Sequence, residues 1–452
     1  MAAFRSRPFR VAVWVSTISW ASIVHGADPV MLREREPNGA TRVLVTLEGK
    51  GLYRPVQSPG ADAGETPKPL ALKVETRLEF VERILERDGR ERPTRAVRRV
   101  LEAGAAVNGE IRPMSSTLRP GVAILFAEAR SDGVLVYSPG GPLTRPELEL
   151  VQGPGDPLEL AGLLPDRPVE PGDRWKVSLS SARGLSAYDT IAGNTLEATL
   201  ATLDDDTAVV RLAGEVKGSI LGGEGSIAFN GSFTFDRKAG RIGRLSLERA
   251  EARRAGPVEA GLDVKSTLVV TRSDADVPPE LLEDAVAKLP VVPEAGRALL
   301  VMNSPDGKYS ITHDRDWHTY WDDPRLTVLR RVARGEIAAQ CNLAVGPNAG
   351  KGRHQDLGQF RDDIRRGLGA RFAGFLGAGE VDGDPAGGFR YKVGVQGRQG
   401  EVGIVWYYYL VASPGGDQLL ATFTMAESQH KAFGDEDVRL IGSLRWKSVD
   451  EK

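Results

Sequence analysis

Residues 70–80 read LALKVETRLEF, and this stretch decides the fold class of the N-terminal part of the chain. Its even positions are apolar apart from one threonine, whereas positions 73, 75, 77 and 79 carry charged side chains. A period of two predicts a strand with one face on a core and the other in water, as is typical of antiparallel sheets. The stretch therefore predicts antiparallel β structure.

Similar runs, separated by turn residues, extend this prediction along the chain. The further strand candidates are 42–49, 122–129, 175–179, 196–203, 208–216, 226–236, 242–251 and 264–272. Residues 94–107 are expected to form one short helix. We therefore expect one mainly antiparallel β domain over residues 40–272, the alternative being two subdomains divided near residues 165–172.

The chain changes character at residues 273–298, where four prolines bracket a short helical stretch. This composition predicts a Pro-rich, semi-rigid linker. Beyond it, residues 299–448 follow the order β-β-β-α-β-β-β-α, with a helix whose apolar face is spaced by three and four residues over 357–372. The fold class predicted for the whole chain is α+β, with this second domain an antiparallel sheet covered by helices.

Residues 1–26 have the layout of a secretory signal peptide. Three arginines precede an apolar stretch that is shorter than the roughly 20 residues needed to span a membrane. Cleavage is expected between Gly26 and Ala27, where no cysteine is available for a lipid anchor. Since no later segment is long and apolar enough to span, we expect a secreted or periplasmic protein with no transmembrane span.

The composition excludes several classes of chemistry. The chain has 452 residues, with 59 Lys and Arg against 61 Asp and Glu, so no basic field exists for nucleic acid. Its single cysteine, Cys341, permits no disulfide framework and, with five dispersed histidines, no structural zinc site. The sequence lacks a correctly spaced nucleophile elbow, phosphate loop or dinucleotide fingerprint. We therefore expect no catalytic residues, no cofactor and no metal.

The richest polar cluster comprises His313, Trp317, His318 and Trp321, which we take as candidate ligand-binding residues. Five residues along an extended strand direct the two imidazoles to opposite faces, which disfavours a metal site. The favoured interpretation is that both histidines lie on the surface.

Tyr407 and Tyr409 complete the candidate set, within the run WYYY at residues 406–409. The run offers aromatic faces on which a flat ligand can stack. The favoured alternative is a central strand covered on both sides, with even positions lining one face and odd positions the other.

Four features of the C-terminal part together carry a resemblance to a known fold. They are the opening strand 309–312 with Trp317, the helix after the extended hairpin, the run 406–409 and the closing residues 444–446. Residues 308–446 resemble the PsbP-like fold, shared by DcrB and Mog-type proteins. The resemblance implies a non-catalytic binding or assembly factor. No photosystem or Ran-binding signature is present, so neither activity is implied. In the N-terminal part, residues 163–175 look like segments of uncharacterised secreted bacterial β-rich proteins.

These observations favour an exported, non-enzymatic protein that binds a ligand or protein partner in the cell envelope or extracellular space. One alternative is a carrier of lipid or another amphiphile, in which the N-terminal sheet curves around an apolar cavity. A second alternative is a hydrolase that uses acidic residues, because the separation of paired carboxylates is set by the fold and not by sequence spacing.

Overall fold

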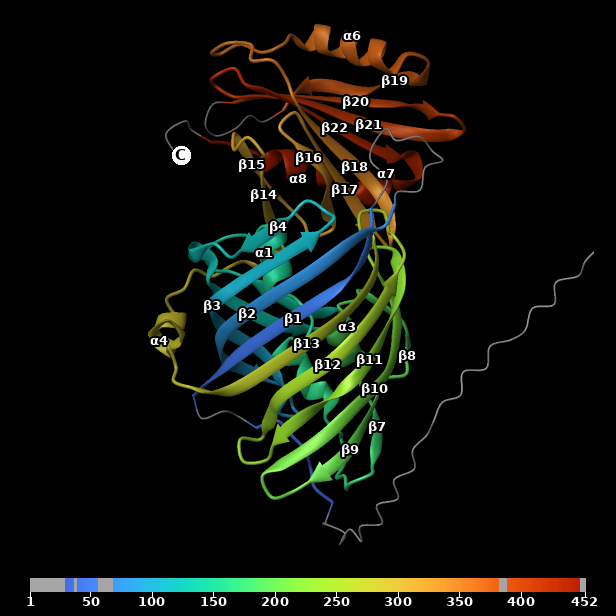
Figure 1. The fold of residues 1–452 in the computed structure, drawn as a ribbon. Coiled ribbons are helices and arrows are strands. Elements are labelled where there is room, and N and C mark those ends of the chain that lie inside the picture. Colours follow the sequence, from blue (N-terminus) through green and yellow to red (C-terminus); the bar gives the residue numbers. More distant parts are fainter. Residues whose placement is uncertain (1–28, 36–38, 56–67, 382–387, 448–452) are drawn as a thin grey trace, which may run out of the picture.

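The computed structural model describes residues 29–35, 39–55, 68–381 and 388–447, so the expected signal peptide and its cleavage site lie outside the described residues. The chain is mostly antiparallel β structure, arranged in sheets of 13, 3 and 7 strands. Figure 1 shows the large sheet curving around short helices, with the two C-terminal sheets at one end of it.

The 13-stranded sheet follows the order β6-β5-β3-β2-β1-β13-β12-β11-β10-β9-β7, with β4 and β8 pairing off this path. Its paired strands are all antiparallel, and β1 and β13 join the two ends of this part of the chain in the middle of the sheet. Its strands are β1 (Ala40–Arg54), β2 (Leu70–Arg87), β3 (Pro93–Gly109), β4 (Met114–Thr117), β5 (Ile124–Arg130), β6 (Gly133–Tyr137), β7 (Arg174–Lys176), β8 (Thr190–Asn194), β9 (Glu197–Leu203), β10 (Thr207–Ile220), β11 (Gly223–Asp236), β12 (Arg241–Arg253) and β13 (Gly261–Ala275).

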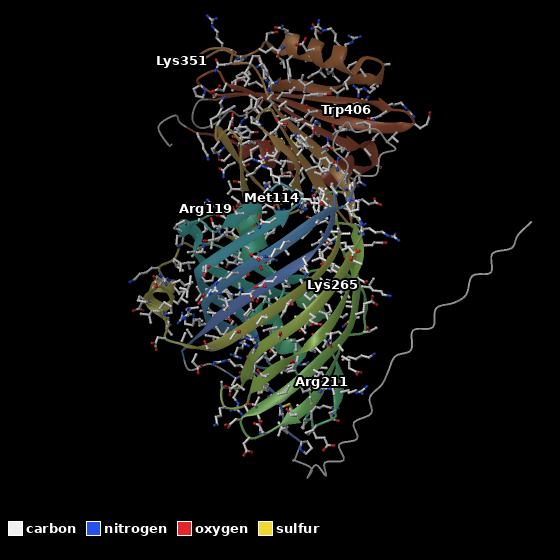
Figure 2. The ribbon with its side chains drawn as sticks, in the orientation of Figure 1. Met114, Arg119, Arg211, Lys265, Lys351 and Trp406 are labelled. Carbon is white, nitrogen blue, oxygen red and sulfur yellow. The ribbon has the colours of Figure 1, made fainter. Side chains whose placement is uncertain are left out.

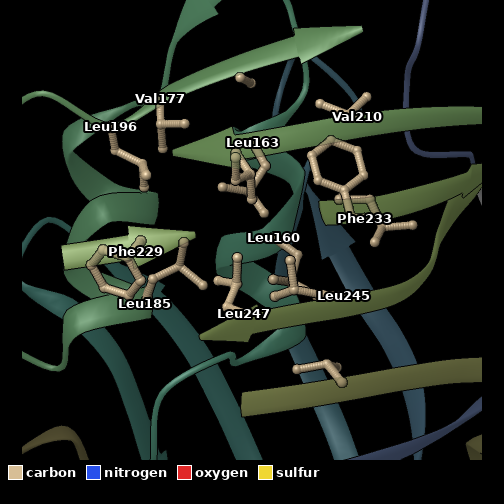
Figure 3. Packing of buried hydrophobic residues seen from close by; sticks show 14 of the residues in the cluster. Leu160, Leu163, Val177, Leu185, Leu196, Val210, Phe229, Phe233, Leu245 and Leu247 are labelled. Atoms are coloured by element: carbon tan, nitrogen blue, oxygen red, sulfur yellow. The ribbon is translucent and has the colours of Figure 1, made fainter. Parts of the chain in front are cut away.

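Three short helices lie against the concave face of this sheet: α1 (Arg145–Val151), α2 (Pro157–Leu160) and α3 (Leu179–Ser186). Each begins at a side chain that accepts a backbone N–H: Thr144, Asp156 and Ser178. Two 3₁₀ turns, η1 (Pro120–Val122) and η2 (Ala161–Leu163), complete this layer. Figure 3 shows apolar side chains of this layer meeting those of the strands, among them Leu160, Leu163, Leu185, Phe229, Leu245 and Leu247. This contact forms the main core.

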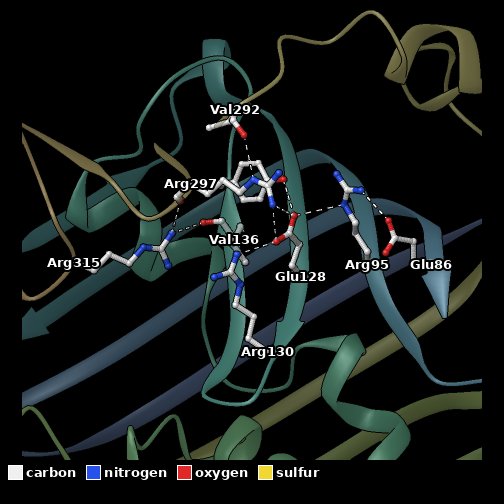
Figure 4. A network of polar contacts seen from close by, with 9 residues as sticks. Glu86, Arg95, Glu128, Arg130, Val136, Val292, Arg297 and Arg315 are labelled. Carbon is white, nitrogen blue, oxygen red and sulfur yellow. Dashed lines mark hydrogen bonds and ion pairs between the residues drawn. The ribbon is translucent and has the colours of Figure 1, made fainter. Parts of the chain in front are cut away.

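The proline-rich segment lies against the convex face of the sheet. It contains the 3₁₀ turn η3 (Pro279–Leu281) and the helical turns α4 (Glu283–Val286) and α5 (Glu294–Arg297). Its apolar side chains pack with Phe126 and Tyr137. Figure 4 shows Arg297 paired with Glu128 at 3.2 Å, and Arg315 donating to the Val136 carbonyl at 2.6 Å. These contacts fix the segment, and the loop after β15, against β5 and β6.

The C-terminal strands form two sheets. β14 (Leu300–Asn303), β15 (Tyr309–His313) and β23 (Arg445–Trp446) form the small one. The larger has the order β16-β17-β18-β22-β21-β20-β19, built from β16 (Trp317–Asp323), β17 (Leu326–Ala333), β18 (Glu336–Val345), β19 (Phe372–Glu380), β20 (Phe389–Gln399), β21 (Val402–Ala412) and β22 (Gln418–Ala426). Every strand pair in both sheets is antiparallel.

Helices cover both faces of the seven-stranded sheet. α6 (Leu357–Leu368), followed by η4 (Gly369–Arg371), packs on the face away from the 13-stranded sheet, whereas α7 (His430–Phe433) and α8 (Glu436–Gly442), after η5 (Glu427–Gln429), pack on the face toward it. The predicted alternation in β21 is present: Trp406 and Tyr408 join the cluster under α6, and Tyr407 and Tyr409 the cluster of α7 and α8. Cys341 is buried in that second cluster.

The helix expected at residues 94–107 is wrong, because this segment belongs to β3. Successive residues are buried on opposite faces: Ala96 packs in the concave cluster and Val97 in the convex one. A bulge shifts the register with β2, so that Glu79 pairs with Glu102 while Phe80 pairs with Val100. Because both faces of β3 are buried and a bulge interrupts the strand, its apolar residues do not alternate with a period of two. Their spacing in the sequence instead resembles that of a helix.

Candidate functional site

Two of the candidate residues, Tyr407 and Tyr409, lie side by side on one face of β21 and share a cation. The Lys392 ammonium lies 4.2 Å from the Tyr407 ring centroid and 5.5 Å from that of Tyr409, and it pairs with Asp437 at 2.6 Å. Tyr409 donates to Asp437 at 2.6 Å, and the Tyr407 hydroxyl lies 2.5 Å from Nε2 of His430. Because these polar groups pair with one another beneath α7 and α8, the cluster is a core network.

Trp317 and Trp321 are separated by the structure, although both belong to β16. Trp317 is 1% exposed and makes edge contacts with Phe423 and Phe433 in the core. Trp321 is 40% exposed, and its indole N–H donates to Asp323 at 2.7 Å. The two indoles therefore form no common platform.

The expectation that His313 and His318 lie on the surface is wrong. Both are buried, His313 in β15 of the small sheet and His318 in β16 of the seven-stranded sheet. Arg145, from α1 of the N-terminal part, donates to the Trp317 carbonyl nearby. Burial, together with the charge of Arg145, lowers the pKa of His318 to about 3 and also lowers that of His313. These histidines are neutral buried groups between the N-terminal and C-terminal sheets. No group of residues in the described ranges has the composition and proximity of a metal site.

A cavity of about 500 Å³ lies against the concave face of the 13-stranded sheet. Its volume falls within the range of roughly 300–1,000 Å³ found for small-molecule sites. Strands β1, β2, β3, β4, β10, β12 and β13 supply one side, and the segment from α1 to α2 supplies the other together with residues 186–188 after α3. Most of the lining is apolar, including Val45, Leu47, Leu78, Phe80, Ala105, Val107, Met114, Leu150, Val151, Ile220, Leu262 and Leu268. Met114 lies at the end of the sheet that adjoins the C-terminal strands (Figure 2).

One polar element of the cavity is a buried ion triad. Arg98 of β3 donates to Glu82 at 2.7 Å and, through both terminal nitrogens, to Asp156 at 2.7 Å. Burial opposes the charge on Arg98, but the two carboxylates outweigh it and raise the pKa of this guanidinium. The same Asp156 accepts the Leu158 N–H at the start of α2, so the triad fixes that helix to the sheet.

A second polar element is formed by Arg249 and Tyr188. Arg249 is 7% exposed, donates one bond of 3.3 Å to the Ser186 carbonyl, and lies 5.9 Å from the Phe229 ring. It forms no ion pair with any described residue, its Nε has no partner among them, and burial lowers its pKa. The Tyr188 hydroxyl is likewise buried without a hydrogen-bond partner in the described chain. Unpaired buried groups of this kind are costly unless something else satisfies them.

Two glycines make room for Tyr188. Gly218 of β10 and Gly225 of β11 are direct cross-strand partners. A Cβ atom on Gly218 would come within 2.7 Å of the Tyr188 ring, and one on Gly225 within 2.7 Å of its hydroxyl. The phenol therefore occupies the space that these two side chains would otherwise fill.

The other charged groups of the cavity are offset or weakened. Arg253 lies 3.5 Å from Glu251 and 3.9 Å from Glu259. Glu149 also lines the cavity; burial raises its pKa above the ordinary value, and the charge of Arg145 partly opposes this shift. Arg249 is thus left without an ion pair to any described carboxylate, although the charge of Glu251 partly offsets the effect of its burial.

A hollow of about 630 Å³ also borders Arg249 and differs in character. Most of its lining residues are exposed, and its lysines, such as Lys50 and Lys265, are interleaved with Glu48 and Glu248. The solvated charges of both signs give it no selectivity for one ion.

Our sequence analysis missed Arg249, Tyr188 and the triad, although β12 carries a signal for the first. Its odd positions face the concave side and read Leu245, Leu247, Arg249, Glu251 and Arg253. The inward phase of the strand therefore changes from apolar to charged, which marks a polar feature inside the curve of the sheet.

Comparisons with known proteins found no matching family model and no matching curated protein. Solved structures that are similar include the cyanobacterial PsbP protein CyanoP of Synechocystis sp. PCC 6803, with 14% identity and a TM-score of 0.26 over 35% of this chain and 98% of that one. The Ran-binding protein Mog1p of Saccharomyces cerevisiae has 8% identity and a TM-score of 0.26 over 32% of this chain and 94% of that one. A Bacteroides thetaiotaomicron protein has 13% identity and a TM-score of 0.24, and the match covers 34% of this chain and 50% of that one. The first two belong to the group that the sequence of residues 308–446 resembles.

Helices in the described ranges are all too short or too polar to cross a membrane.

Proposed function

We propose that this chain is an exported, non-catalytic binding protein that carries an amphiphile in the concave cavity of its 13-stranded sheet. The observation that supports this proposal most directly is the cavity of about 500 Å³, which has a largely apolar lining. Elsewhere the concave face of the sheet is filled by side chains of the protein itself. A cavity with such walls favours an apolar chain over water, because water needs two to four polar partners.

The proposal assigns different roles to the two parts of the chain. Residues 40–272 are the ligand-binding domain, and residues 299–448 are a PsbP-like domain with a role in assembly or partner binding. The signal peptide expected at residues 1–26 directs the protein to the envelope or the exterior. Of the acidic residues that face the cavity, Asp156 is engaged by Arg98 together with Glu82, and Glu251 lies 3.5 Å from Arg253, so these carboxylates serve ion pairs in the proposed carrier.

Native mass spectrometry of the mature protein, purified gently from its own envelope or culture fluid, tests this function. We expect an additional mass of lipid size that is lost on denaturation. A protein recovered bare from every preparation, which also fails to take up added amphiphile, would contradict the proposal.

A matched pair of substitutions locates the ligand. Ala105→Trp places a large ring in the cavity, whereas Ala106→Trp places it on the opposite face of the same strand. Occupancy should fall in the first variant and stay unchanged in the second. Equal occupancy in both variants, with equal thermal stability, would place the ligand elsewhere.

A further inference from the structure

The cavity is apolar along most of its wall and contains one arginine, Arg249, that forms no ion pair with a described residue, which suggests what the polar end of its ligand is. We infer that the ligand is an anionic amphiphile with a single acidic head group, and that Arg249 and Tyr188 bind this group. The inference rests on the proposed function and adds the chemical class of the ligand.

The first argument is the charge of Arg249. A buried guanidinium without an ion pair loses hydration that one bond to a backbone carbonyl and the face of the Phe229 ring do not replace. Two other buried arginines of the 13-stranded sheet, Arg98 and Arg272, are each paired with a carboxylate at 2.7 Å. Arg249 departs from that pattern at a position that lines the cavity. An acidic head group supplies the missing partner through charge-assisted hydrogen bonds.

The second argument is the arrangement of Tyr188 beside it. Ser186 links the two residues, since its carbonyl accepts from Arg249 and its hydroxyl oxygen accepts the Tyr188 N–H at 3.2 Å. Tyr188 lines the cavity and contributes a neutral O–H donor that lacks a partner in the described chain; this hydroxyl is buried against Gly225, so the phenol must turn toward the cavity to reach a head group. Two unused donors of this kind suit an oxyanion.

The third argument is the fit between head and chain. The aliphatic walls on β1, β2 and β3 belong to the same cavity as the two donors. A ligand with one acidic group and one apolar chain satisfies both, whereas an alcohol of equal length leaves the charge of Arg249 unbalanced. A fatty acid carboxylate is the simplest probe of this class.

Delipidated full-length protein titrated with oleate and with oleyl alcohol tests the inference. We expect oleate to bind at least about 10-fold more tightly, as one charge-assisted hydrogen-bonded pair predicts. Arg249→Gln should abolish this preference, Arg249→Lys should retain part of it, and Tyr188→Phe should weaken oleate about 3- to 10-fold. Arg211→Gln, on the exposed outer side of β10 (Figure 2), is the control and should change nothing.

The outcomes separate the two proposals. Binding of neither probe overturns the carrier function and the inference with it. Equal binding of both probes by the unaltered protein overturns the inference and leaves the carrier function standing. If Arg249→Gln fails to fold, the oleate-to-alcohol ratio of the unaltered protein and the Tyr188→Phe variant still decide the matter.

Discussion

The ion triad of Arg98, Glu82 and Asp156 gives the sharpest stability prediction. Replacing Arg98 by Met keeps a long apolar stem but removes the cation, so two carboxylates at 1% and 8% exposure lose their shared partner. Three charge-assisted hydrogen bonds of 2.7 Å are lost. Each such bond contributes about 1.5–3 kcal/mol, and the sum over the three is an upper bound on the loss of stability because the bonds share one guanidinium and are not additive. Breaking a buried ion pair on one side costs about 3–5 kcal/mol, which is the decrease expected here in the free energy of unfolding.

Urea unfolding followed by far-UV circular dichroism measures this loss, with Arg99→Met as the matched control. Arg99 is the next residue of the same strand, and its pair with Glu280 at 3.0 Å is solvent-exposed on both sides. Its removal should cost about 0–1 kcal/mol. The reasoning would be refuted if the two substitutions lowered stability equally, since the difference between them is attributed to burial alone.

Two further predictions concern single polar groups. Burial, followed by the nearby Asp156, raises the pKa of Glu159 to about 8, so the folded chain holds a proton that the unfolded chain releases near 4.5. The contribution of Glu159 to stability should therefore fall as pH rises from about 4.5 to 8, so the difference in melting temperature between the unaltered protein and Glu159→Gln should change over that range; a constant difference would contradict the assignment. Tyr409→Phe should cost about 1–3 kcal/mol, because Asp437 loses one of its two partners, whereas Tyr408→Phe on the opposite face of β21 should cost less.

Much of the fold follows from local pattern, and the exceptions have a common cause. The stretch 70–80 has one buried and one solvated face, so its period of two is visible in the sequence. In β21 both faces are covered and the run of large residues is continuous, which is the pattern expected of a central strand and not an alternation. In β3 the two faces are unequal and a bulge intervenes, so no single period remains. Pattern analysis succeeds where the environment alternates regularly and fails where it does not.

The candidate residues in the C-terminal part fail for a different reason. The residue type of a histidine or an aromatic residue shows which contacts it can make, but it does not show which side chains of other elements pack against it. His318 is buried because Arg145, more than 170 positions away in the chain, reaches the same region from α1. Tyr407 and Tyr409 meet Lys392 and Asp437 from other elements. Only the tertiary arrangement shows that Tyr407, Tyr409, Lys392 and Asp437 contact one another in the core.

The cavity residues were missed because a charged side chain in a strand is normally read as solvent-facing. Arg249 shares the inward phase of Leu245 and Leu247, and its exposed neighbours Glu248 and Ala250 occupy the other phase. A charge placed in the buried phase costs stability, so its presence requires a partner inside the curve of the sheet. For Arg98 that partner is in the chain. For Arg249 the described chain supplies no ion-pair partner. Because the two buried arginines of one cavity differ in this way, a ligand with an acidic group accounts for the position of Arg249.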